Sequence, residues 1–204
     1  MSNPYKLAST GLLFLLIQMV IVLGLMVAMA IGMASKNDQI LKQGAMFAVY
    51  IMGAVLLPGA IGKVLCLLSE ISVLGRVFIG LSVFSEFGGA ISPFMNLPPA
   101  INSITQLGAF FFLFGYLLIL ANDLKNREVK IVLISAFVCM LISAVSIGLM
   151  PIFRKDDMVV LAAGVIGLGF IVYGTMLYMR SLVFLRRAIA KWEPAKDEGD
   201  QTPA

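Results

Sequence analysis

Long apolar stretches separated by short charged clusters dominate this chain. From Leu7 to Ser35 no residue is charged, which is more than the ~20 helical residues needed to cross a hydrocarbon core about 30 Å thick. Similar stretches recur along the sequence and predict an all-α fold, a polytopic transmembrane helical bundle. Six spans are expected, over residues 10–34, 44–68, 71–90, 97–122, 129–150 and 158–188, followed by a disordered polar tail over 192–204.

The third span is the weakest of the six, because Arg76 and Glu86 lie inside it. The alternative is a bundle of five spans in which this segment is re-entrant and does not cross the membrane. The fourth span is preceded by Asn96, which we expect to cap the helix, with two prolines in its first turn. We prefer six spans because every loop is then short.

The basic residues predict the orientation of the bundle. With six spans and a cytoplasmic N-terminus, only Lys36, Lys42, Arg154 and Lys155 lie outside, and the remaining 11 of 15 basic residues lie inside. A five-span bundle with an external N-terminus gives a similar excess, ten inside and five outside. For six spans, both termini are cytoplasmic and the location is a cell membrane, most simply a bacterial inner membrane.

Composition removes several classes of function. The 204 residues are 60% hydrophobic and 13% charged, with a net charge of +4 and no histidine. Without histidine the chain offers no His-ligated metal or haem, and no Ser-His or Cys-His catalysis. The charges fall in short clusters between spans, which argues against nucleic-acid binding. No cofactor is expected, and Cys66 and Cys139 have no metal or redox spacing.

Small residues at four-residue spacing mark faces where helices approach closely. The first span carries Gly24, Ala28 and Gly32, and the last carries Ala163 and Gly167, with Gly174 one heptad further along. We expect these residues to serve packing inside the bundle, with a dimer face as the alternative.

Charged residues within spans are the candidates for a site. Lys63 and Arg76 lie seven residues before and six residues after Glu70. A hairpin turning near Ser69 places both cations ~9 to 10 Å from the turn, at similar depth on adjacent helices. The simpler interpretation is that each side chain reaches the headgroups independently. The sharper one is a basic pocket for an anionic lipid or ligand, formed by Lys63, Arg76 and Glu70, with Asp123 as another nearby acid. Glu86 is expected near the outer end of its span.

The last helix ends in a basic segment. Arg180, Arg186 and Arg187 follow Tyr173 and Tyr178, a pattern typical of a helix that leaves the bilayer through an aromatic zone at the cytoplasmic face. The three arginines are candidates for contact with headgroups or with a partner.

These observations favour a non-enzymatic structural or accessory membrane component, bound to its own copies or to another membrane subunit. The alternative is a transporter or channel for a lipid-like, small hydrophobic or anionic molecule. A lipid-modifying enzyme ranks below both, because isolated carboxylates lack the paired geometry that such catalysis uses.

Overall fold

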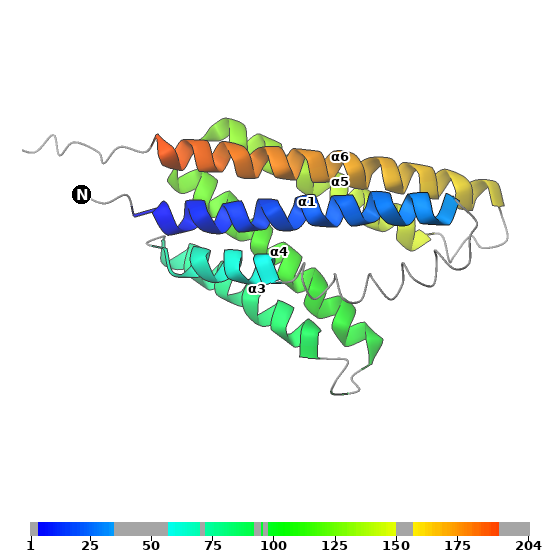
Figure 1. Cartoon of the computed structure of the whole chain (residues 1–204), viewed down its shortest axis with the longest axis horizontal. Helices are drawn as coiled ribbons and strands as arrows, with labels where there is room; N and C mark the ends of the chain where they lie inside the picture. The colour runs from blue at the N-terminus through cyan, green and yellow to red at the C-terminus, as the bar shows by residue number, and fades with distance from the viewer. Residues whose placement is uncertain are drawn as a thin grey trace, which may run out of the picture.

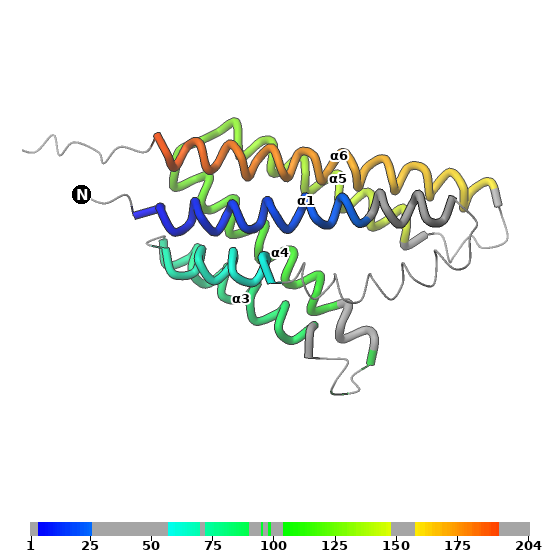
Figure 2. Tube along the Cα trace, viewed as in Figure 1, coloured from blue at the N-terminus to red at the C-terminus, as the bar shows by residue number. Residues whose placement is uncertain are grey.

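The computed structural model describes residues 4–34, 57–69, 72–91, 95, 98–149 and 157–191 (Figure 2). Within these ranges all regular secondary structure is helical, which confirms the predicted all-α fold. The expected tail over 192–204 lies outside them. Six helices occur in the described part of the chain: α1 (Lys6–Ala34), the Leu57–Leu67 helix, α3 (Val73–Ile91), α4 (Pro99–Asp123), α5 (Arg127–Leu149) and α6 (Asp157–Ala190).

Four of these helices are long and apolar enough to cross a membrane. They contribute Lys6–Leu25, Ile104–Asp123, Arg127–Ile147 and Met158–Ala190. This finding supports a membrane location. The Leu57–Leu67 helix is shorter, and α3, with 19 residues, rises about 28 Å but carries the charges that made its span the weakest prediction.

Local hydrogen bonds explain the turn from α4 to α5. The Lys125 N–H donates to the carbonyl of Asn122 (2.9 Å) and the Asn126 N–H to that of Ala121 (3.0 Å), which is the Schellman pattern of a helix C-terminus. Lys125 has a φ of 51°, the left-handed conformation that this motif requires and that usually selects glycine. The Asn126 side chain then accepts a hydrogen bond from the Val129 N–H (3.1 Å) and so caps α5.

The helix starts of α3 and α4 differ in kind. The Ser72 hydroxyl accepts a hydrogen bond from the Gly75 N–H (3.4 Å), as a side-chain N-cap does. Helix α4 begins at Pro99, with Pro98 and not Asn96 in the N-cap position. Of the two prolines predicted in the first turn, Pro99 lies there and Pro98 precedes it as the N-cap residue. The predicted cap residue was wrong, because the helix begins two residues later than expected.

Consecutive described helices alternate in direction along the bundle (Figure 1). Helix α6 packs against α5 and α1, α3 packs along α4, and α4 contacts α5. Helices α3 and α4 diverge from α1, α5 and α6 toward the end away from the N-terminus (Figure 1). The arrangement resembles a V whose closed end holds the N-terminus, the α4–α5 turn and the C-terminal end of α6.

The buried core occupies the closed end of the V, where the helices converge. Phe114, which is 2% exposed, lies 5.3 Å from both the Phe137 and the Tyr178 rings. The fully buried aliphatic residues come from the halves of the helices nearest this end: Leu12, Leu15, Ile79, Leu117, Leu120, Leu133, Leu182 and Leu185.

Helix α1 and the Leu57–Leu67 helix cross with their backbones in contact. A Cβ atom on Gly11 would lie 2.5 Å from the Gly62 carbonyl oxygen and 2.6 Å from the Cys66 sulfur. At such separations a glycine at the crossing cannot be replaced by a residue with a side chain unless the helices move apart. Cys66 itself is buried, with its sulfur 3.9 Å from the Ala8 carbonyl oxygen, and therefore serves the expected packing role.

The small residues of α6 face α5. A Cβ atom on Gly167 would lie 2.9 Å from the Ile147 side chain, and one on Gly174 would lie 3.1 Å from the Cys139 Cβ. The Ser143 hydroxyl also donates to the Gly167 carbonyl (2.8 Å). On this helix the small residues serve internal packing, as predicted. Gly24 of α1 differs, because nothing among the described atoms lies within 4 Å of a Cβ built there.

Candidate functional site

A buried ion pair joins the Leu57–Leu67 helix to α3. The Lys63 Nζ lies 2.5 Å from the Glu86 Oε2, and the two side chains are 6% and 22% exposed. A charged pair so little exposed to solvent is costly to bury unless each partner neutralises the other. The contact therefore links two helices at a buried position where a single charge is unfavourable.

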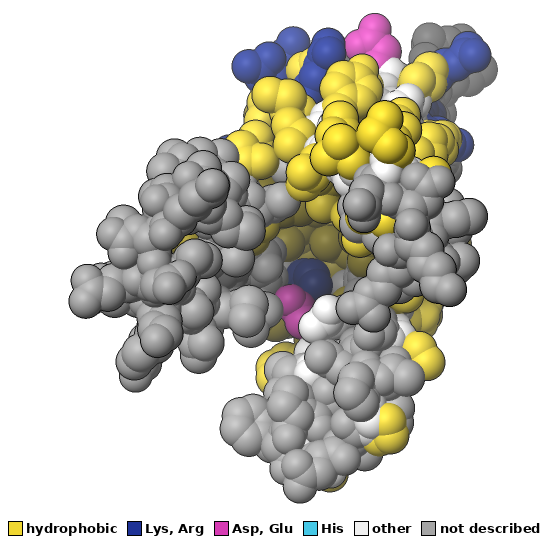
Figure 3. Space-filling model, turned by 90° about the vertical axis from the view of Figure 1, so that its right-hand side faces the viewer, with side chains coloured by type: hydrophobic (Ala, Val, Ile, Leu, Met, Phe, Trp, Pro, Cys, Tyr) yellow, Lys and Arg dark blue, Asp and Glu magenta, His cyan; other side chains and the backbone are white. Residues whose placement is uncertain are grey.

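Glu86 lies five residues before the end of α3, on the part of this helix that diverges from the rest of the bundle (Figure 1). Figure 3, seen from the open end of the V, shows a hollow with one basic and one acidic side chain adjacent inside it. On α3, the buried Ser82 hydroxyl donates to the Ala109 carbonyl of α4 (2.7 Å). Gln18 of α1 lies against Gly59, where a Cβ atom would clash with the amide.

The structure changes the interpretation of the predicted basic pocket. Lys63 is only 5% exposed and paired with Glu86, so the expectation that it reaches the headgroups was wrong. Arg76 is exposed and precedes Glu86 by ten residues, about 15 Å of helix. Lys63 and Arg76 are thus not seen together at one site, and Glu70 lies outside the described residues. Glu86 lies five residues before the end of α3, near one end of its helix as expected, but its pairing with Lys63 was not predicted.

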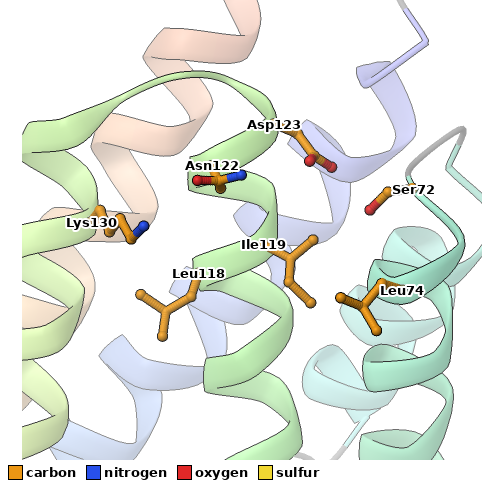
Figure 4. A pocket seen from close by; sticks show the side chains of 7 residues that line it. All are labelled: Ser72, Leu74, Leu118, Ile119, Asn122, Asp123 and Lys130. Carbon is orange, nitrogen blue, oxygen red and sulfur yellow. The ribbon is translucent and has the colours of Figure 1, made fainter.

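A second feature lies at the closed end of the V. A pocket of about 410 Å³ opens where the start of α3, the end of α4 and the start of α5 meet. Figure 4 shows its lining side chains, which are Ser72, Leu74, Leu118, Ile119, Asn122, Asp123 and Lys130. Its lower part is apolar and its rim is polar, with one acid and one base.

Asp123 is the most unusual group of this rim. Its Oδ2 atom is buried and has no hydrogen-bond partner in the described part of the chain. The carboxylate also acts on Tyr5, which precedes α1. Burial first, and the negative charge of Asp123 second, raise the pKa of the Tyr5 hydroxyl above its ordinary value of 10.0. Tyr5 is therefore neutral at physiological pH.

The three arginines at the end of α6 have different surroundings. Arg180 is exposed, with its guanidinium 5.1 Å from the centre of the Phe184 ring, and Arg187 is exposed. The Nε atom of Arg186 is buried without a hydrogen-bond partner among the described residues. Contact of these arginines with headgroups or a partner stays a prediction. Tyr178 is 2% exposed, so its predicted place in an interfacial aromatic zone was wrong.

Two groups of side chains that the fold brings together, the Lys63–Glu86 pair and the polar rim of the pocket, were not predicted from the sequence. The Lys63–Glu86 pair had a signal, because two opposite charges within neighbouring apolar stretches each need a partner. The rim formed by Asn122, Asp123 and Lys130 had none beyond the presence of charges at two helix ends. Chemically, the ion pair offers an electrostatic cross-link between two helices, and the pocket offers a mixed polar and apolar surface.

Comparisons of this chain with protein-family models, with characterised proteins and with solved structures found no match.

Proposed function

We propose that this chain is a non-enzymatic multi-pass membrane protein that acts as a structural or accessory component, associating with its own copies or with another membrane subunit. It crosses a bacterial inner membrane six times, with both termini in the cytoplasm. The alternating directions of the described helices support six crossings (Figure 1). The positive-inside rule supports the orientation, because Lys6, Lys125, Arg127 and Lys191 all belong to the closed end of the V.

Cysteine labelling tests this topology. A cysteine replacing Asn37 and one replacing Asn126 are expected to react from opposite sides of the membrane. A cysteine at Pro93 is expected to react from the same side as the one at Asn37. Reaction at Pro93 from the side of Asn126 would instead support five spans with a re-entrant segment.

The outer face of α6 is the observation that supports association. Val165, Ile166, Val172, Tyr173 and Met176 are between 45% and 64% exposed and recur at the three- and four-residue spacing of one helix face. Gly169 lies on the same face, with no described atom within 4 Å of a Cβ built there.

A hydroxyl group within this face distinguishes it from an ordinary lipid-facing surface. Tyr173 precedes Arg180 by seven residues, about 10 Å of helix toward the bilayer interior. No hydrogen bond to its hydroxyl occurs among the described residues. A hydroxyl without a partner in hydrocarbon costs roughly 2 kcal/mol or more, and a polar group on a neighbouring helix removes this cost.

A photo-crosslinker tests the proposal in native membranes. A benzophenone amino acid in place of Tyr173 is expected to give a protein adduct, whose mass identifies a second copy or another subunit. The matched control is the same residue at Val138, which lies near the middle of α5 and is 46% exposed. Lipid adducts alone at both positions would contradict the association.

Transport is the second candidate, favoured by the hollow in which one basic and one acidic side chain lie adjacent (Figure 3). A small anionic or lipid-like molecule entering the hollow would compete with Glu86 for Lys63. Solute flux into proteoliposomes separates the two candidates. Flux that is lost in the charge-swapped variant Lys63→Glu with Glu86→Lys, while the fold and the crosslink are retained, would support transport over the accessory role.

A further inference from the structure

The pocket at the closed end of the V has two layers. Leu118 and Ile119 precede Asp123 on α4 by five and four residues, which places them roughly 6 to 8 Å deeper along the helix. Leu74 completes the apolar part from α3. The polar rim coincides with the end of the apolar window Ile104–Asp123. A ligand bound here therefore has an apolar portion inside the bilayer and a polar portion at its surface.

The rim carries two opposite charges, Asp123 and Lys130. In the part of the chain that the structure describes, neither Asp123 nor Lys130 belongs to an ion pair. The ammonium of Lys130 points toward Asn122 across the pocket, and the carboxylate of Asp123 lies on the side of Ser72 (Figure 4). The two charges thus lie at separate places along one rim.

The Asp123 carboxylate has unmet hydrogen-bonding capacity. Its buried Oδ2 accepts no hydrogen bond from a described residue, and a buried acceptor without a donor is unfavourable. Because Asp123 also lines the pocket, a cationic donor bound there can form a charge-assisted hydrogen bond with its carboxylate.

We propose that this pocket binds a phospholipid whose headgroup carries both a primary ammonium and a phosphate, of the phosphatidylethanolamine type. The ammonium donates to Asp123, the phosphate accepts from Lys130, with Asn122 and Ser72 as further donors, and the chains lie on Leu118 and Leu74. A choline headgroup lacks N–H donors for the carboxylate. An anionic glycerol headgroup brings no cation to Asp123 and is repelled by it. The proposal is independent of the accessory role.

Lipid binding to the purified, delipidated full chain tests this assignment. Native mass spectrometry measures apparent affinities for phosphatidylethanolamine, phosphatidylcholine and phosphatidylglycerol with identical acyl chains. We expect phosphatidylethanolamine to bind about tenfold more tightly than either other lipid, since a hydrogen bond to a charged group contributes at least this much when formed. Equal binding of the three lipids, or a preference for phosphatidylglycerol, would overturn the proposal.

Substitutions of pocket residues test whether the preference for phosphatidylethanolamine arises at this pocket. Asp123→Asn is expected to reduce phosphatidylethanolamine binding to the level of phosphatidylcholine, and Lys130→Gln to weaken the binding of both. The matched control is Glu128→Gln, which removes an exposed carboxylate from the first turn of α5 and should leave the preference unchanged. A preference that survives Asp123→Asn, or that Glu128→Gln removes, would place the lipid elsewhere. If Asp123→Asn does not fold, the three lipids on the unaltered chain decide the question.

Discussion

Removing the negative charge of Glu86 is expected to destabilise the bundle more than removing the positive charge of Lys63. The two side chains form an ion pair with an N–O distance of 2.5 Å, but their exposures differ, 6% for Lys63 and 22% for Glu86. Glu86→Gln therefore leaves a nearly inaccessible ammonium without a counter-charge. Lys63→Met leaves a carboxylate that retains some access to water, and the cost of the unpaired charge is therefore smaller.

The geometry sets the size of the effect. At 2.5 Å, with an effective dielectric constant near 20, the Coulomb attraction is about 7 kcal/mol. Desolvation of the two ions opposes it by several kcal/mol each, so the net contribution of the pair is small. Breaking the pair is a different quantity, because the desolvation cost remains without the attraction. We expect Glu86→Gln to cost about 3 to 5 kcal/mol, and the double variant Lys63→Met with Glu86→Leu to lie within about 1 kcal/mol of the original chain.

Reversible unfolding in mixed detergent micelles, followed by circular dichroism, measures these differences. Ser85→Ala is the matched control, since Ser85 neighbours Glu86 on α3 and is also partly buried. The reasoning would be refuted if both single variants unfolded at the same denaturant concentration as the original chain. It would also fail if the double variant lost more stability than either single variant, because apolar replacement would then be worse than an unpaired charge.

Three further predictions concern backbone packing, turn geometry and pH. Gly11→Ala is expected to lose at least about 1 to 3 kcal/mol of stability, because its Cβ would lie 2.5 Å from a backbone carbonyl oxygen. Gly24→Ala, which has open space around its Cβ, should change stability by no more than about 1 kcal/mol. Equal effects of the two variants in thermal unfolding would contradict the close crossing of the helices. Lys125→Gly is expected to stabilise the α4–α5 turn by about 1 kcal/mol, because the left-handed conformation at a φ of 51° is unfavourable for lysine but not for glycine. A lower melting temperature of this variant would argue against the Schellman turn. The pKa of Tyr5 is raised in the folded chain by burial and by Asp123, so its contribution to stability is constant below pH 10 and is lost as the pH rises above that value. Ultraviolet titration of the phenolate, with Tyr5→Phe as the reference, should show this group ionising at a higher pH than an ordinary tyrosine. Ionisation at or below pH 10 would contradict both its burial and its proximity to Asp123.

Parts of the fold could be predicted because each depends on a short stretch of sequence. An apolar stretch longer than the hydrocarbon thickness must form a helix in lipid, since every backbone polar group needs a partner within the segment. The position of the prolines at the start of α4, the packing role of Gly167, and the burial of Cys66 follow from similarly local rules.

The candidate sites could not be predicted in the same way. The spacing of residues from the turn of a hairpin predicted that Lys63 lies near Arg76. This prediction assumed that the two helices lie side by side and that equal distances from the turn correspond to equal depth. The divergence of α3 from α1 (Figure 1) and the packing of the Leu57–Leu67 helix instead bring Lys63 to Glu86. Tyr178 was assigned to the membrane surface by its position before Arg180, yet it packs against Phe114.

The sequence by itself determined the helical character of this chain, its apolar lengths, and the concentration of basic residues at particular helix ends, because these depend on the solvent that each segment must satisfy. The tertiary structure alone decided which charges meet, which face of α6 stays open, and that three helix ends enclose a pocket with Asp123 and Lys130 on its rim. The physical reason is that crossing angles and rotations of packed helices arise from many side-chain contacts between distant segments. A rotation of one helix by a single residue, about 100°, would change which side chains contact each other. Local sequence patterns do not indicate such a change.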